Sequence, residues 1–337
     1  MQWFFVLVQV MVLLFGCEAG DAPTEEAKSI QMLDRSSETD TLPLVRAADS
    51  LLYRQLMLAL ANGDRSGRWP VQDPIPLPGA IFPYQRVVAF YGNFYCKGMG
   101  ILGAFAAEEV LHQLRQQVRV WQQADTALTV IPALHYIAVT AQSSACDGKY
   151  RARMPDTEIQ KAISMAQNIN GLVFLDVQVG LSTLQHELPL LLPYLKLPQV
   201  HLGIDPEFSM KTGKRPGTAI GSFDAADINY AAGLLADLVQ AHQLPPKILV
   251  VHRFTDAMIT RTNEIQLHPE VQIVIHMDGF GSPNLKRSSY QQFINRQPVQ
   301  FTGFKVFYQN DVVYGKRIMQ PHEILQLQPR PVYIQYQ

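Results

Sequence analysis

The sequence predicts an α/β protein folded as a single (β/α)8 barrel of the TIM type. Eight apolar, strand-like runs recur between residue 86 and the end of the chain, and helical patterns separate them. Continuous apolar runs are typical of parallel strands buried on both faces, and their alternation with helices favours a closed barrel. An open, doubly wound sheet is the alternative, but no nucleotide-binding fingerprint accompanies the strands.

The strands and helices are expected to alternate along the chain. The expected strands are 86–92, 129–140, 171–178, 199–205, 247–252, 271–278, 301–309 and 331–336. The expected helices are 104–118, 156–169, 183–195, 224–242, 256–266, 288–296 and 321–327. Several helices begin near residues that cap helix N-termini, such as Asp156 and Ser222.

Seven helices leave one position of the barrel's outer layer uncovered. Residues 44–61 have a strongly helical pattern, and we expect this segment to cover the position of the eighth helix. The following stretch, 62–85, contains five prolines and is expected to be an extended connector. Residues 44–337 are therefore expected to form one domain.

Composition excludes several classes of protein. Of the 337 residues, 47% are hydrophobic and 17% are charged, which is enough apolar material for a large core and excludes fibrous and disordered chains. Lys and Arg number 28 and Asp and Glu 29, so there is no basic field to hold a phosphate backbone. Nucleic acid is not an expected partner.

The first residues look like a targeting signal. An apolar run, 3–15, is too short to span a bilayer and leads to Leu14-Phe15-Gly16-Cys17, which resembles the lipobox of bacterial lipoproteins. We expect residues 1–17 to be a lipoprotein-type signal peptide lipidated at Cys17, and 18–43 to be a disordered linker. The body would then be extracytoplasmic and membrane-anchored. An uncleaved N-terminal anchor is the alternative.

Carboxylates close three of the expected strands. Asp176, Asp205 and Asp278 end the third, fourth and sixth strands, where ligand chemistry gathers in such barrels. Crowded carboxylates raise one another's pKa, which is one route to a general acid. The alternative is that structural ion pairs with Arg253, Lys305 or Arg151 neutralise them. Further candidate ligand-binding residues near strand ends are Tyr91, Asn93, Gln178, His252 and Gln309.

The sharpest short motif is Asp205-Pro206-Glu207 at the end of the fourth strand. If the chain stays extended, Asp205 and Glu207 face the same side. The pattern resembles acid/base pairs of certain glycoside hydrolase barrels, in which the Glu protonates the glycosidic oxygen. The seventh strand departs from those enzymes, because it offers Gln309 and Asp311 where many carry a nucleophilic Glu.

Metal and cofactor chemistry is not expected from the sequence. His252 and His276 lie on the fifth and sixth strands, but the first strand lacks the His-x-His pattern of amidohydrolase-type metal sites. We interpret His276 as an interior histidine and expect neither a metal nor a cofactor. No G-x-S-x-G motif supports a serine hydrolase.

Longer segments carry a family resemblance over residues 86–337. They are FYGNFYCKGMGILG, GLVFLDVQVG, HLGIDPEFSM, PPKILVVHRF and HPEVQIVIHMDGFGSPNLK. Together they resemble an uncharacterised bacterial family of secreted or lipid-anchored proteins with a glycoside-hydrolase-like (β/α)8 barrel. The resemblance implies that fold but no substrate and no catalytic residue.

These observations favour a surface-anchored barrel that acts on or binds a polysaccharide, such as cell-wall glycan. Glu207 would be the general acid/base, Asp205 would orient it, and Asp176 and Asp278 would stabilise positive charge on the sugar ring. The alternative is a non-catalytic barrel that binds glycan or another cell-surface partner.

The two other cysteines of the chain suggest a disulfide. Cys96 and Cys146 follow the first and second expected strands, and the two loops lie on the same rim of a barrel. Disulfides persist in exported proteins, so we expect these residues to be bonded. Two unrelated thiols, or part of a metal site, are the alternatives.

The lipoprotein hypothesis makes a direct prediction. Replacing Cys17 with Ser removes the atom that carries the lipid, so the protein should leave the membrane fraction or remain unprocessed. Immunoblots of fractionated cells check this. Wild-type cleavage and membrane association of Cys17→Ser would show that Cys17 is not lipidated.

Overall fold

The structure, a computed structural model, describes residues 50–337. The expected signal peptide 1–17, the linker 18–43 and Cys17 lie outside the described residues. Within residues 50–337, no helix is long and apolar enough to cross a membrane.

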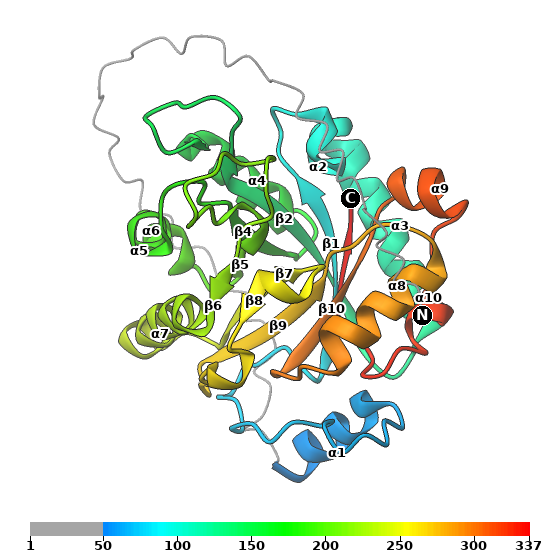
Figure 1. The fold of residues 1–337 in the computed structure, drawn as a ribbon. Coiled ribbons are helices and arrows are strands. Elements are labelled where there is room, and N and C mark those ends of the chain that lie inside the picture. The colour runs from blue at the N-terminus through cyan, green and yellow to red at the C-terminus, as the bar shows by residue number, and fades with distance from the viewer. Residues whose placement is uncertain (1–49) are drawn as a thin grey trace, which may run out of the picture.

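Eight parallel strands form a closed barrel, which confirms the predicted fold class (Figure 1). Their order around the barrel is β1-β11-β10-β9-β7-β5-β4-β2, and β1 pairs with β2 to close it. Each predicted run overlaps one of these strands: β1 Gln85–Gly92, β2 Thr129–Ala141, β4 Leu172–Val177, β5 Val200–Ile204, β7 Lys247–Arg253, β9 Val271–Met277, β10 Phe301–Val306 and β11 Tyr333–Tyr336. Three short strands lie outside the barrel ring: β3 Arg151–Arg153, β6 Phe223–Asp224 and β8 Ile259–Thr260.

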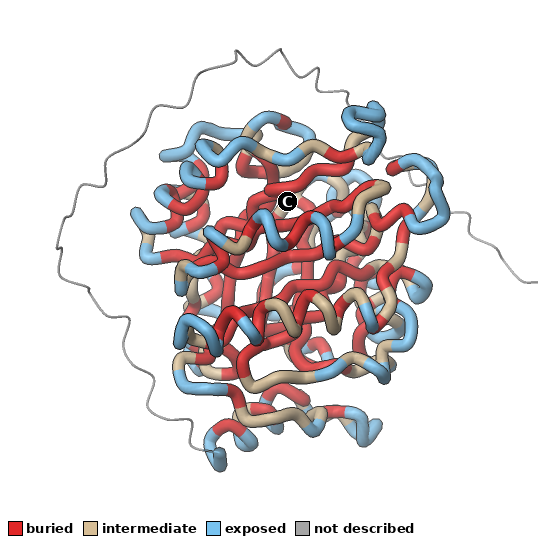
Figure 2. Tube along the Cα trace, turned by 90° about the vertical axis from the view of Figure 1, so that its left-hand side faces the viewer, coloured by how far each residue is buried: buried red, intermediate tan, exposed pale blue. Residues whose placement is uncertain are grey.

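Helices surround the barrel, and Figure 2 shows buried residues concentrated along the central strands with exposed ones on the outer coils. The helices are α1 Ser50–Ala61, α2 Ile101–Ala104, α3 Ala107–Ala124, α4 Asp156–Gln167, α5 Leu184–Glu187, α6 Leu192–Leu195, α7 Ala225–His242, α8 Pro283–Tyr290, α9 Asn310–Gly315 and α10 Pro321–Ile324. Most predicted helices are present, although 183–195 is split by a 3-10 turn and α8 continues as a π-turn, Gln291–Asn295.

The prediction of a helix over residues 256–266 is wrong. Two 3-10 turns, Asp256–Met258 and Thr262–Glu264, flank the short strand β8 there. The β-branched pair Ile259–Thr260 suits an extended backbone and pairs with β6, while Arg261 adopts a left-handed conformation that interrupts any helix.

The barrel interior changes character along the strands. An inner apolar cluster contains Val87, Phe174, Val250 and Phe301, which point inward from the lower and middle parts of their strands. Because side chains alternate with a period of two, the next inward positions after Phe174 and Val250 are Asp176 and His252. The interior is therefore apolar near the strand starts and polar near the strand ends.

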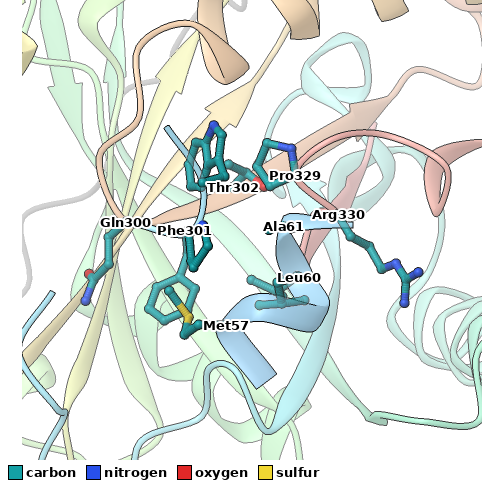
Figure 3. Close-up of a pocket in the computed structure, with 11 residues that line it drawn as sticks. Met57, Leu60, Ala61, Gln300, Phe301, Thr302, Pro329 and Arg330 are labelled. Atoms are coloured by element: carbon teal, nitrogen blue, oxygen red, sulfur yellow. The ribbon is translucent and has the colours of Figure 1, made fainter. Parts of the chain in front are cut away.

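Helix α1 lies across the N-terminal end of the barrel, beneath the starts of the strands (Figure 1). Its buried residues Tyr53, Met57 and Leu60 form one face and pack in the same cluster as Phe82 and Phe301. A cavity of about 10 Å³ lies between this helix and the barrel, room for about one water molecule, and Figure 3 shows the residues that line it. The helix thus closes the floor of the barrel, because its single apolar face packs against the apolar interior.

The outer face of β11 is covered by α3. Trp121 Nε1 and Gln117 Nε2 each donate a hydrogen bond of 2.8 Å to the Tyr336 hydroxyl at the end of β11. Helix α1 at the barrel floor therefore does not take the place of the eighth helix, as we expected of residues 44–61, and α3 lies against the end of β11 instead.

The structure does not contain the predicted Cys96–Cys146 disulfide, and both cysteines are free. β2 runs on to Ala141 and pairs with antiparallel β3, so the chain between them forms a hairpin rather than a loop folded over the rim. Cys146 lies exposed in that hairpin turn, whereas Cys96 is buried behind the end of β1.

The packing of α1 makes a stability prediction. Met57 is 5% exposed and its neighbour Leu58 is 61% exposed. Truncating a buried Met to Ala removes packing and leaves a cavity, so Met57→Ala should lower the free energy of unfolding by about 2–5 kcal/mol. Leu58→Ala on the same helix should change it by less than about 0.5 kcal/mol. Urea denaturation measures both, and equal effects would contradict this position of α1.

The two thiols should differ in reactivity. In the Cys17→Ser chain, the exposed Cys146 should react with Ellman's reagent in the native protein, and the buried Cys96 only after unfolding. Finding no reactive thiol in unfolded, unreduced protein would show instead that the disulfide forms.

Candidate functional site

A cluster of polar side chains occupies the interior near the C-terminal ends of the strands. Every member is buried, and each comes from a different strand: His135 (β2), Asp176 (β4), His252 (β7), His276 (β9), Lys305 (β10) and Gln335 (β11). We call these six residues the interior cluster. Buried polar groups are costly unless they find partners, so their contacts define the site.

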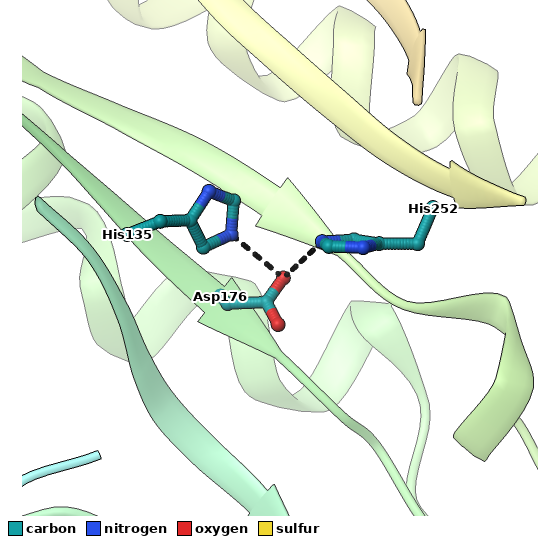
Figure 4. Close-up of side chains that lie close together, drawn as sticks. All are labelled: His135, Asp176 and His252. Atoms are coloured by element: carbon teal, nitrogen blue, oxygen red, sulfur yellow. Dashed lines mark ion pairs between the residues drawn. The ribbon is translucent and has the colours of Figure 1, made fainter. Parts of the chain in front are cut away.

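Asp176 lies at the centre of the interior cluster. Its Oδ1 is 3.3 Å from His135 Nε2 and 3.5 Å from His252 Nε2 (Figure 4). The other oxygen, Oδ2, accepts a hydrogen bond of 3.2 Å from the Tyr91 hydroxyl. One carboxylate thus joins side chains from three further strands.

A chain of ionic contacts leads from Asp176 toward the mouth of the barrel. His252 Nδ1 lies 2.7 Å from Asp278 Oδ2, and Lys305 Nζ lies 3.0 Å from Asp278 Oδ1. The Lys305 ammonium also lies 3.9 Å from the centre of the Tyr91 ring, a cation–π contact. Asp278, 9% exposed in its side chain, is the outermost carboxylate of this chain.

Burial and nearby charges together set the protonation states of the histidines and aspartates in the interior cluster and its neighbour Asp278. Burial lowers the pKa of His135 to about 4, so this ring is neutral. Burial alone would also lower the pKa of His252, but Asp176 and Asp278 outweigh it and raise the pKa to about 10. Burial would raise the pKa of both aspartates, yet Lys305 and His252 beside Asp278, and His252 and His135 beside Asp176, hold their pKa values well below the usual range.

Asp205 and Glu207 lie at the end of β5 and behave differently. Burial, with the charges of Asp176 and Asp278, raises the pKa of Asp205 to about 7. Burial, with the charges of Asp205 and Asp278, raises the pKa of Glu207 to about 8. The chain does not stay extended here as expected, because Pro206 begins a 3-10 turn, Pro206–Phe208. Asp205 caps that turn by accepting a 3.0 Å hydrogen bond from the Glu207 backbone N–H.

Only some of the predicted ligand-binding residues lie with the interior cluster. Tyr91 and His252 belong with the interior cluster, and Gln178 Nε2 donates to the Tyr91 hydroxyl at 3.3 Å. Asn93 is buried and holds the turn after β1, through Ile137 O at 3.0 Å and the Tyr95 N–H at 2.9 Å. Gln309 is exposed at the start of α9, outside the cluster.

Of the three basic residues weighed as structural partners, only Lys305 contacts the carboxylates of the cluster. Arg151 pairs with Glu187 and Asp147, and Arg253 binds loop carbonyls and Gln297. Asp311 forms a buried ion pair with Lys286 instead.

His135 and Tyr333 are the site residues that the sequence reasoning missed. Tyr333, on β11, contacts His135 Nδ1 through its hydroxyl at 2.6 Å. The available signal was a lone histidine in the apolar run TVIPALHYIAVT, at an inward position of β2. Only the closure of the barrel brings that position beside Asp176 on β4 and His252 on β7.

No family model and no curated protein sequence matches this chain. Sixteen chains of solved structures are similar to it. One of them is a cellulase, Cel5C_n, which is 14% identical, with a TM-score of 0.39, over 69% of each chain. The barrel assignment rests on the strand order of the chain itself.

Proposed function

We propose that this protein is a glycoside-hydrolase-like barrel that acts on a polysaccharide, with Glu207 as its general acid/base. The observation that carries the proposal is a difference between two carboxyl groups at one barrel mouth. Glu207 keeps its proton at neutral pH, whereas Asp278 is ionised beside Lys305. In glycosidases, two carboxyl groups have different environments that separate their pKa values. One group then serves as the acid and the other as the anion.

Each carboxyl group takes a role that its surroundings allow. Glu207 is half-buried at the strand ends and is the proton donor to a glycosidic oxygen. Asp205 fixes the Glu207 backbone through its 3.0 Å hydrogen bond and orients it. Asp278 stabilises positive charge that develops on the sugar ring. Asp176 has no exposed surface, so it acts as a positioning residue through Tyr91 and His252.

The second carboxylate of the reaction would be Asp278 rather than a residue of β10. Gln309 is exposed away from the cluster, and Asp311 is buried with Lys286. A mechanism with two glutamates is therefore not part of the proposal.

A non-catalytic, glycan-binding barrel is the second candidate, and one observation favours it. The interior cluster is almost wholly enclosed, while an aromatic residue on α9 is open: Tyr314 is 59% exposed, and its ring lies 5.1 Å from the ring of Phe280, two residues after Asp278. Exposed aromatic rings bind sugars by stacking without any chemistry.

The proposal includes a location for the protein. A lipid at Cys17 would anchor it on the membrane outside the cytoplasm, with cell-wall glycan or another cell-surface ligand as its partner. The lipobox-like sequence at residues 14–17 supports this part of the proposal.

Glu207→Gln should abolish most turnover. Loss of a general acid lowers kcat by about 10²–10⁴-fold, so turnover of a glycan panel should fall by that factor. Glu264→Gln is the matched control, because Glu264 is exposed and its carbonyl bonds to Asn229 on the outer helix α7. Turnover that survives in Glu207→Gln would overturn the assignment. Glycan binding without turnover in the wild type would establish the second candidate.

The pH dependence follows from the protonated state of Glu207. The acid form is needed, so kcat/KM should fall as the pH rises through about 8, the pKa to which burial and Asp205 raise Glu207. An alkaline limb that persists unchanged in the residual activity of Glu207→Gln would mean that another group donates the proton.

A further inference from the structure

The barrel interior has the geometry of a metal site. We propose that His135 Nε2, Asp176 Oδ1 and His252 Nε2 bind one divalent ion of the zinc type. These three atoms lie within 4.8 Å of one another, and they come from β2, β4 and β7. This site does not depend on the proposed glycosidase activity.

Two of the three separations match tetrahedral coordination. Two ligand atoms that each lie 2.0–2.1 Å from a tetrahedral Zn²⁺ are about 3.3–3.4 Å apart. The two nitrogens lie 3.3 and 3.5 Å from the shared Asp176 oxygen. Octahedral Mg²⁺ would require neighbouring ligands about 2.9 Å apart and prefers oxygen donors. Two imidazoles and one carboxylate are a donor set that zinc favours.

The three ligand atoms have no hydrogen-bond partner within the described chain. His135 Nε2, Asp176 Oδ1 and His252 Nε2 are all buried, and none makes a hydrogen bond with a described residue. Two nitrogens directed at one oxygen without hydrogen-bond geometry are unusual in a folded interior, where buried polar atoms are nearly always paired. A cation between them would satisfy all three, and His252 would bind it as the neutral imidazole, releasing its proton on binding.

The backbone leaves room at this point. Gly203, on β5, faces the same place, and a Cβ there would lie 2.5 Å from His135 Nε2 and 2.6 Å from Asp176 Oδ1. Both atoms are proposed ligands. Glycine has no side chain, and any larger residue at position 203 would collide with the two ligand atoms.

Each proposed ligand is oriented from behind by a second group. The far nitrogen of His135 contacts the Tyr333 hydroxyl at 2.6 Å, and the far nitrogen of His252 contacts Asp278 at 2.7 Å. The second oxygen of Asp176 accepts from Tyr91 at 3.2 Å. Carboxylate or hydroxyl partners that fix the ring orientation are a regular feature of metal-bound histidines.

A second group, His252, His276 and Asp278, meets the same spacing limit but fits less well. Asp278 already uses Oδ2 for His252 and Oδ1 for Lys305. Asp176 Oδ1 has no such commitment. The structure therefore assigns the ion to the Asp176 group, with three protein ligands and a fourth position for water.

Metal content tests the proposal without any assay of activity. The full-length protein is purified from zinc-supplemented cells, and a second portion is unfolded in chelator and refolded with Zn²⁺. After dialysis, mass spectrometry of the elements should find about one Zn²⁺ per chain in both. Replacement by Co²⁺ should give the intense visible absorption of a tetrahedral ion.

Variants locate the ion. Asp176→Asn should lose the zinc, whereas His201→Gln should keep it, because His201 is an equally buried interior histidine on β5 outside the group. Tyr333→Phe keeps the aromatic ring and removes only the hydroxyl behind His135. It should weaken zinc binding by about 10–100-fold, and it keeps the test decisive if Asp176→Asn does not fold.

Two results would overturn the site. One is wild-type protein without zinc in both preparations. The other is full zinc occupancy in folded Asp176→Asn or, if that variant does not fold, zinc binding of wild-type strength in Tyr333→Phe. Loss of activity in Glu207→Gln has no bearing on either result, so the two proposals fail separately.

Discussion

Charge compensation around two buried aspartates is the constraint on which the upper half of the barrel depends. Moving a carboxylate out of water costs several kcal/mol, and only close, well-oriented partners offset this. His252 lies between the two, 3.5 Å from Asp176 and 2.7 Å from Asp278, and Lys305 completes the chain. Because these partners come from different strands, the charges can be balanced only in the closed barrel.

The same constraint shapes the space around the cluster. Large polar rings fit into the barrel because small residues face them. A Cβ on Gly303, in β10, would lie 2.7 Å from the His276 ring, and Gly203 leaves equivalent room for His135. The apolar layer below, sealed by α1, separates these groups from water at the barrel floor. Chemistry is thereby confined to the mouth, where Glu207 is half-buried near Asp278.

Sequence patterns predicted the barrel well because continuous apolar runs and short connections leave few alternatives. They failed where tertiary packing decides the outcome, as at Ile259–Thr260, which pairs with β6 instead of forming a helix. Asp176 and Asp278 were found because they end apolar runs. His135 was not, since one histidine inside an apolar strand gives no spacing to interpret. Its partners, on β4, β7 and β11, adjoin it only in the folded barrel.

Burial, together with the charges of Asp205 and Asp278, keeps a proton on Glu207 at neutral pH. The most direct measurement is a carboxyl ¹³C NMR titration of chelator-treated, glutamate-labelled protein, in which the Glu207 signal is identified by its loss in Glu207→Gln. This signal should titrate near pH 8, and at lower pH when Asp278 is replaced by Asn. Titration near the ordinary glutamate pKa of about 4.3 would contradict it.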